Sequence, residues 1–290
     1  MFSDTHCHLG TVASRGENLA DLLSSMTSSG FRFVLDIGTR PGDFAGRLSQ
    51  LTEASGGALP EFLHFSCGLW PDPASIANRE DSLSALKSDL LEMLSRRPAY
   101  AALGECGLDR YWNGANAPGL ESHAGEDGPG TADIAGEEEL FGAQLVMARE
   151  FGLPAIIHSR DAFEPTLACV RDAGWDSGVI HCFSYGKDEA RAFLDRGWYI
   201  SFPGNVTWAK KEADRERIAS LVRYVPRDRL LLETDAPYLT PAPHRGATNT
   251  PLLIAHTYER VASILGLDVG ALAAIVEANA SELFRTSYSA

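Results

Sequence analysis

The sequence lacks any apolar run of about 18 residues that could cross a bilayer. Its first residues contain neither a basic segment followed by an apolar run nor a small-residue cleavage site, so we expect no secretory signal. Cysteine is scarce, and the five thiols lie mostly within apolar, strand-like runs rather than at the spacings of a disulfide framework. We therefore expect a cytoplasmic protein with reduced thiols and no membrane partner.

Positive charge is also in short supply. The chain has 25 Lys and Arg against 39 Asp and Glu, which gives a formal net charge of −14 at pH 7. Because affinity for a phosphate backbone comes largely from clustered Lys and Arg, this composition argues against a protein that coats long duplex DNA. It does not exclude a nuclease, since bound divalent cations would add positive charge that a sequence count omits.

The residues that are present predict a globular barrel. With 44% hydrophobic residues among 290, the chain can bury a sizeable core. Short apolar runs alternate with helix-like segments, which is typical of βαβ units around a parallel sheet. There are eight such runs, and eight strand–helix pairs favour a TIM-type (β/α)8 barrel over an open sheet of five or six strands. We predict one α/β barrel domain spanning residues 1–290.

The predicted strands lie within residues 2–8, 31–37, 62–69, 100–106, 153–158, 178–182, 198–202 and 230–235. The predicted helices include residues 74–96, 137–151, 161–173, 187–196, 211–222, 251–265 and 269–284. Residues 112–136 interrupt this alternation, because they are rich in Gly, Pro, Ala, Asp and Glu and lack apolar periodicity. We interpret them as a flexible insertion after the fourth strand, either a flap over the site or a surface insertion without a role.

Polar side chains recur where the predicted strands end. His6 and His8 are two residues apart in the first apolar run, so a strand would turn them to one face. Four more lie at the ends of the fourth, fifth, sixth and eighth runs: Glu105, His158, His181 and Asp235. The carboxyl ends of barrel strands share one mouth, where such a cluster would be unfavourable to bury without a metal. Imidazole and carboxylate ligands therefore predict a metal centre.

Five ordered motifs resemble those of a known family. They are residues 4–8 (DTHCH), 104–109 (GECGLD), 157–161 (IHSRD), 181–184 (HCFS) and 232–238 (LETDAPY). Together they resemble the signature motifs of the TatD family of metal-dependent hydrolases, over nearly the whole chain. The resemblance implies that one ion is held by His6, His8 and Asp235, a second by His158 and His181, and both by Glu105.

The resemblance also implies a reaction. Two divalent ions, Mg²⁺, Mn²⁺ or Zn²⁺, about 4 Å apart can clamp the attacking and leaving oxygens of a phosphoryl displacement and activate a water. Asp235 is the candidate general base, and Glu105 is the ligand shared by both ions. We therefore expect a deoxyribonuclease or phosphodiesterase, acting as a monomer on single-stranded or terminal DNA or on a small phosphodiester or ester.

The sequence departs from the family pattern at positions near the expected substrate site. Many members of the family carry Gly-x-His-Pro after the third strand, where this chain has Trp70, and the basic stretch that tends to follow Arg245 is missing. We predict that Trp70, Arg160 and Arg245 contact substrate, although Arg160 could instead be an exposed arginine that opens a helix. The alternatives are an amidohydrolase-like esterase or deacylase, acting on a small ester, amide or aminoacyl-tRNA, and a catalytically silent metal-binding scaffold.

Several other polar residues are not proposed as metal ligands. Asp4 and Glu233 share strand faces with the proposed ligands, so they either orient those ligands or are structural. The remaining histidines show no convergent partner in the sequence, and we interpret them as surface or core residues. They are His64, His123, His244 and His256.

Overall fold

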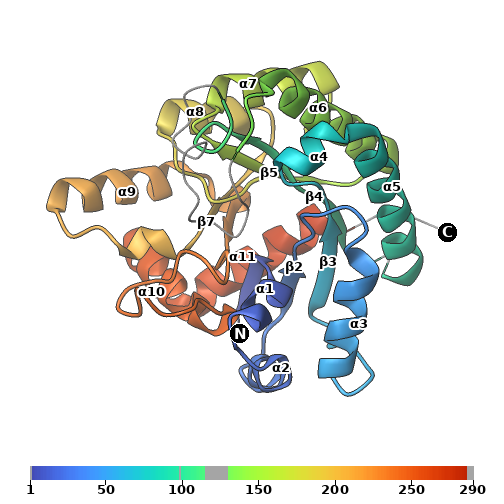
Figure 1. The fold of residues 1–290 in the computed structure, drawn as a ribbon. Coiled ribbons are helices and arrows are strands. Elements are labelled where there is room, and N and C mark those ends of the chain that lie inside the picture. Colours follow the sequence, from blue (N-terminus) through green and yellow to red (C-terminus); the bar gives the residue numbers. More distant parts are fainter. Residues whose placement is uncertain (1, 98, 115–129, 286–290) are drawn as a thin grey trace.

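The structure is a computed structural model that describes residues 2–97, 99–114 and 130–285. Eight strands form one parallel sheet in the order β1 to β8, and helices surround them (Figure 1). Each predicted apolar run overlaps one strand, although β4 and β5 extend beyond the predicted runs, and the predicted (β/α)8 barrel is confirmed. The strands are β1 (Ser3–Cys7), β2 (Phe33–Asp36), β3 (Leu63–Cys67), β4 (Ala101–Asp109), β5 (Ala155–Arg160), β6 (Gly178–Ile180), β7 (Tyr199–Phe202) and β8 (Leu230–Leu232).

At least one α-helix follows every strand. The α-helices are α1 (Leu9–Ser14), α2 (Leu19–Ser28), α3 (Phe44–Ala54), α4 (Pro73–Ala77), α5 (Arg79–Arg96), α6 (Ile134–Phe151), α7 (Phe163–Ala173), α8 (Lys187–Leu194), α9 (Glu212–Tyr224), α10 (Ile254–Leu265) and α11 (Val269–Phe284). The single helix predicted over residues 74–96 is wrong. It is two helices, because Asn78 leaves helical geometry and its side chain donates back to the carbonyl of Ala74.

The predicted insertion is shorter at its carboxyl end than the sequence indicates. Residues 134–136 already belong to α6, because the Asp133 side chain accepts a hydrogen bond from the Gly136 N–H and caps the helix there. Residues 115–129 lie outside the described part of the chain, so the flap or surface insertion stays a prediction.

The barrel closes between β1 and the residues that follow β8. The Asp235 N–H donates to the His6 carbonyl at 2.9 Å, and the His8 N–H donates to the Ala236 carbonyl at 2.8 Å. All residues of β1, β2, β3 and β4 are buried, as expected for strands covered on both faces. The closing hydrogen bonds therefore lie directly beside the proposed metal ligands.

The last helix, α11, packs across β8, β1 and β2 (Figure 1). The Asn279 side chain donates to the carbonyls of Arg227 and Leu230 at 2.7 and 2.8 Å, where β8 begins. Phe284 stacks on Phe33 with ring centroids 5.5 Å apart. Helix α11 thus covers the amino end of the barrel, whereas the proposed metal ligands lie at the carboxyl end.

Among the described residues, no single helix is long and apolar enough to span a membrane. Residues 251–265 and 269–284 meet the length and composition criteria only when taken together, and the two are bent by 105° at their junction.

Candidate metal centre

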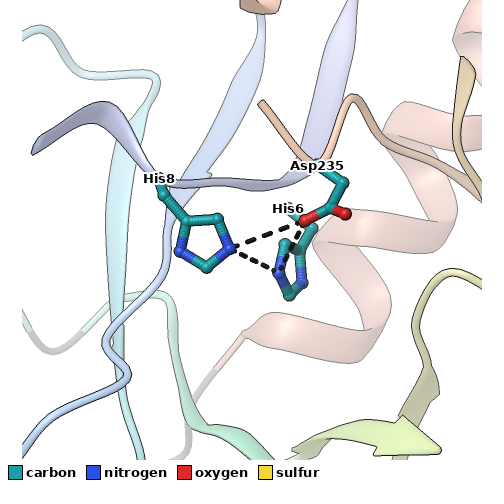
Figure 2. A group of neighbouring side chains, drawn as sticks. All are labelled: His6, His8 and Asp235. Carbon is teal, nitrogen blue, oxygen red and sulfur yellow. Dashed lines mark hydrogen bonds and ion pairs between the residues drawn. The ribbon is translucent and has the colours of Figure 1, made fainter. Parts of the chain in front are cut away.

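The first cluster forms where the barrel closes. His6 Nε2 and His8 Nε2 are 3.3 Å apart, and Asp235 Oδ1 lies 3.7 Å from the former and 3.5 Å from the latter. Figure 2 shows the three side chains directed toward one another. Asp235 reaches this position with φ of 54°, a left-handed conformation that aspartate tolerates better than most residues.

The second cluster lies on the strands across the barrel mouth. Glu105 Oε1 is 2.9 Å from His158 Nδ1 and 3.0 Å from His181 Nε2. The same two imidazole nitrogens are 3.3 Å from each other. Three donor atoms therefore surround one point, from β4, from β5 and from the residue after β6.

Glu105 joins the two clusters. Its second oxygen, Oε2, lies 3.2 Å from His6 Nε2 and 3.7 Å from His8 Nε2. One carboxylate therefore offers one oxygen to each group of imidazoles. The structure brings all six predicted ligands together at the carboxyl end of the barrel.

Glu105 does not end its strand, as the sequence indicated, because β4 continues to Asp109. The pairing register between β4 and β5 shifts between Leu103 and Cys106, which is where Glu105 lies. A β-carbon on Gly68, the residue after β3, would overlap the backbone of Gly104. Glycine at position 68 therefore leaves room for the irregular part of β4. Local irregularity, rather than a strand end, places this carboxylate in the mouth.

The donor atoms fit bound cations. Around an ion with bonds of about 2.1 Å, neighbouring ligand atoms are separated by about 3.0 to 3.4 Å. The separations within the clusters run from 2.9 to 3.7 Å. Imidazole nitrogens that face each other at such distances need a proton or a cation between their lone pairs. Each cluster could therefore hold a divalent ion.

Electrostatics within the clusters point the same way. Burial lowers the pKa of His158, but hydrogen bonds with Asp109 and Glu105 outweigh it and raise the pKa to about 9. Burial likewise opposes charge on His181, whereas the Glu105 carboxylate raises its pKa well above the usual value. Burial raises the pKa of Glu105, yet His181 and the hydrogen-bonding imidazoles together hold it well below its usual range. A divalent cation would take the place of these protons.

His6 differs from the other histidines of the clusters. Burial, followed by the charge of His181, lowers its pKa, so this ring is neutral and ready to act as a ligand. The two rings are stacked, with centroids 4.0 Å apart and planes 8° apart.

Asp109 is a functional residue that the sequence reasoning missed. Its Oδ2 lies 2.9 Å from His158 Nε2, and its Oδ1 accepts the N–H groups of Tyr111 and Trp112 at 3.0 Å each. An acceptor at Nε2 leaves the lone pair of His158 on Nδ1, which faces Glu105. A signal was available, because Asp109 is four residues after Glu105 in the same motif and ends the same strand.

Asp4 and Glu233 hold backbone around the clusters. Glu233 Oε1 accepts the N–H of Cys182 at 2.6 Å and lies 3.7 Å from His181 Nδ1, which is too long for a hydrogen bond. Asp4 accepts both the N–H and the hydroxyl of Thr234, at 2.9 and 2.6 Å, and burial raises its pKa to about 7. These carboxylates thus fix the residues next to His181 and next to Asp235.

Aromatic rings flank both clusters. The Trp70 ring meets His158 edge to face, with centroids 5.9 Å apart, as expected for a residue at the mouth. Tyr238, which was given no role, makes a similar contact with His8 at 6.1 Å, and the Arg15 guanidinium lies 4.7 Å from its ring centre. One aromatic side chain therefore adjoins each cluster.

The predicted substrate arginines lie further out. Arg160, at the end of β5, is exposed and stacks on Tyr111 at 3.9 Å. Arg245, in the loop after β8, is exposed and stacks on Trp208 at 4.3 Å. Neither guanidinium forms an ion pair with a proposed metal ligand in the described part of the chain.

The histidines interpreted as lacking partners have different outcomes. His64 is buried against Phe33 and Tyr100, as expected of a core histidine. His244 and His256 do have a partner, since their Nε2 atoms are 3.0 Å apart. Twelve residues of chain separate them, and only the fold brings the loop and α10 together. His123 lies outside the described residues.

Comparison with known proteins links this site to one family. A family model described as TatD related DNase matches residues 3–285. The Escherichia coli K12 protein named "Uncharacterized metal-dependent hydrolase YcfH" is 33% identical, over 99% of this chain and 96% of its own length. The "3'-5' ssDNA/RNA exonuclease TatD" of Edwardsiella piscicida is 33% identical, over 79% of this chain and 80% of its own. The crystal structure of YjjV, a TatD homolog from Escherichia coli K12, is 25% identical with a TM-score of 0.73, covering 98% of this chain and 97% of that one.

Proposed function

This chain belongs to the TatD family of metal-dependent hydrolases, and from that premise we propose that it is a phosphodiesterase that removes terminal nucleotides from single-stranded DNA. The observation that carries the proposal is the shared carboxylate, because Glu105 offers one oxygen to each of two imidazole clusters. Such a pair of sites suits the in-line displacement at a phosphodiester. The proposal agrees with the exonuclease name of a relative.

We assign one divalent ion, Mg²⁺, Mn²⁺ or Zn²⁺, to each cluster. The ligands of the first are His6, His8 and Asp235, those of the second are His158 and His181, and Glu105 is common to both. When bound, these ions would supply positive charge for the phosphoryl oxygens and a water whose pKa is lowered towards about 7.

Two carboxylates of the protein are given roles beside the ions: one deprotonates the attacking water, and the other orients a histidine ligand. Asp235 directs Oδ1 to His6 and His8, while its other oxygen points away from both rings (Figure 2). We assign that oxygen as the general base that accepts the proton of the attacking water. Asp109 keeps His158 in the tautomer that presents Nδ1.

Stacking explains how a chain with few cations could hold nucleic acid. Trp70 and Tyr238 each adjoin one cluster, and base stacking on an aromatic ring contributes about 1–3 kcal/mol per base without regard to sequence. Because the chain carries a surplus of acidic residues, a long phosphate backbone would be repelled. The terminal nucleotides of a single strand have bases that can stack on these rings, and they bring only a short stretch of phosphate backbone to the site.

We further propose that the protein acts as a monomer in the cytoplasm. Its five cysteines are free thiols, which suits a reducing compartment. Light scattering of the metal-loaded protein should give the mass of one chain, 31.3 kDa. A mass of two chains or more would contradict the monomer.

The test is a parallel assay of the metal-loaded enzyme on three substrate classes: DNA oligonucleotides labelled at either end, an aryl phosphodiester and an aminoacyl ester. We expect stepwise shortening of single strands from one end, together with hydrolysis of the aryl phosphodiester. Glu105→Ala, purified identically, controls for contaminating nuclease. Internal cutting of duplex DNA would overturn the terminal specificity, and turnover of the aminoacyl ester without any phosphodiester cleavage would replace the phosphodiesterase with a deacylase.

A further inference from the structure

A cavity opens at the same end of the barrel as the metal centre. It has a volume of about 560 Å³ and lies between the turn after β7 (Gly204–Thr207), the loop after β8, and α10. Both β7 and β8 lead into it from their carboxyl ends, the end where barrel enzymes bind ligands. The polar residues that line it are Thr207, Arg215, His256, Glu259 and Arg260. In the described part of the chain, none of them is hydrogen-bonded or ion-paired to a proposed metal ligand.

Two arginines line this cavity, in a chain with a surplus of acidic residues. Arg215 and Arg260 line it, with Glu259 as its one acidic residue. Arg215 donates to the Lys210 carbonyl and lies 3.4 Å from Glu212. Arg260 is half-buried and has neither a salt bridge nor a hydrogen bond to any residue that the structure describes. Although the chain has 39 acidic residues, none that the structure describes is paired with Arg260, so its guanidinium is available to an anionic ligand.

Glu259, the acidic residue that lines the cavity, has a histidine as its neighbour. Glu259 Oε2 lies 3.5 Å from His256 Nδ1, and the opposite nitrogen of the same ring is 3.0 Å from His244 Nε2. His256 therefore stands between the carboxylate and a second imidazole. Glu259 is thus paired with His256 and not with Arg260, which keeps its guanidinium available to a ligand, whereas Arg215 already contacts Lys210 and Glu212.

The rim of the cavity offers a stacked ring. Trp208, the residue after Thr207, anchors its indole N–H on the Thr240 carbonyl at 2.9 Å. Arg245 covers the Trp208 ring at 4.3 Å and lies two residues after Pro243, which lines the cavity. Arg245 and Trp208 are therefore neighbours in sequence of residues that line the cavity, although neither lines it itself.

We propose that this cavity is a phosphate subsite, formed chiefly by Arg260 and Arg215, that binds a phosphate other than the one at the metal centre. A guanidinium matches two phosphate oxygens at once, and a pair of guanidinium groups would repel a metal cation. Phosphate could reach the cavity from the backbone of the substrate strand or as a free phosphate. The first source rests on the proposed nuclease function, and the second does not.

The binding test is independent of catalysis. Inorganic phosphate is titrated into ¹⁵N-labelled, Mg²⁺-loaded protein while the arginine side-chain Nε–H signals are followed. The signals are assigned from the variants Arg260→Gln and Arg215→Gln. We expect a saturable shift of the Arg260 signal below about 10 mM phosphate, and no shift of the Arg217 signal, an exposed residue of α9 that does not line the cavity. An Arg260 signal that does not move over this range overturns the subsite.

Kinetics then identifies the source of the phosphate. Arg260→Gln should raise the KM for a six-nucleotide single strand about tenfold, with little change in kcat, and leave the KM for an aryl phosphodiester unaltered. The KM of Arg260→Lys for the six-nucleotide strand should lie between those of the wild-type enzyme and Arg260→Gln. The KM of Arg217→Gln should equal that of the wild-type enzyme. An equal effect of Arg260→Gln on both substrates overturns the strand subsite. If the wild-type enzyme cleaves no oligonucleotide while phosphate still shifts Arg260, the nuclease proposal fails and the cavity stands as a site for free phosphate.

Discussion

Two histidines of the same barrel, His64 buried and His158 half-buried, have pKa values displaced in opposite directions. His64, on β3, packs between the rings of Phe33 and Tyr100 at 4.7 Å each, and burial lowers its pKa to about 4. For His158, on β5, burial also lowers the pKa, but two carboxylates at 2.9 Å raise it to about 9. Burial is common to both, so the partners decide the charge.

The two surroundings serve different ends. Around His64, aromatic packing holds an uncharged ring in a core that α11 completes through Phe284. Around His158, polar atoms face one another in a form that is stable only with protons or cations between them. Substitutions in the first region should therefore change stability, and substitutions in the second should change metal binding and catalysis.

The largest effect should come from removing the carboxylate shared by the two clusters. Glu105→Ala should lower kcat/KM at least about 10³-fold while the barrel stays folded, since it deletes a ligand of both ions. Turnover of an aryl phosphodiester at saturating Mn²⁺, with circular dichroism as the check of folding, measures this. Glu150→Gln, on the exposed last turn of α6, is the matched control. A folded Glu105→Ala protein with activity within tenfold of wild type would refute the shared role.

A smaller effect should follow from reversing the hydrogen bond that orients His158. Asp109→Asn can keep the Oδ1 contacts to Tyr111 and Trp112, but its amide group would donate to His158 Nε2 and move the ring proton to Nδ1. Metal affinity should fall about 10–100-fold.

Calorimetric titration with Mn²⁺ separates this positioning role from a structural one. Excess Mn²⁺ should restore most of the kcat of Asp109→Asn. A lowered melting temperature with unchanged Mn²⁺ affinity would show that Asp109 only supports the fold.

The lowered pKa of His64 should make the free energy of unfolding depend on pH. Because the folded pKa of about 4 lies below the ordinary 6.5, the unfolded chain takes up the proton first as pH falls. Stability is therefore lost between about pH 6.5 and 4 and is unaffected above that window. Relative to His64→Phe, the wild-type protein should lose about 2 kcal/mol of unfolding free energy between pH 7 and pH 5. Urea unfolding of both proteins at each pH gives the difference, and parallel pH profiles would contradict it.

The smallest effect concerns the exposed charges outside both regions. Because we propose that few protein cations contact the substrate, we expect the KM for a single-stranded oligonucleotide to rise less than about tenfold between 50 and 200 mM salt. A protein with 6–10 phosphate contacts would lose about 10³–10⁵ in affinity over the same range. A steep dependence of that kind would mean that backbone charge, and not the clusters with their aromatic neighbours, holds the substrate.

The sequence predicted the barrel and all six proposed ligands, because apolar runs and strand-end polar residues are local patterns that the parallel topology converts into neighbours. It did not predict the roles of Asp109 and Tyr238, although both lie in recognised motifs. Nor could it predict the pairing of His244 with His256, since that depends on how a loop folds over a helix. α1, α2 and α3 also went unpredicted, and α3 buries only Phe44 and Leu51, too few apolar residues for a clear helical stripe.

Electron paramagnetic resonance of the Mn²⁺-titrated protein tests the proposed bridging role of Glu105 most directly. We expect two Mn²⁺ per chain with an exchange-coupled spectrum, because one carboxylate lies between the two clusters. The coupling should be absent in Glu105→Ala. Saturation at one Mn²⁺ per chain, or two ions that give uncoupled spectra in the wild-type protein, would contradict it.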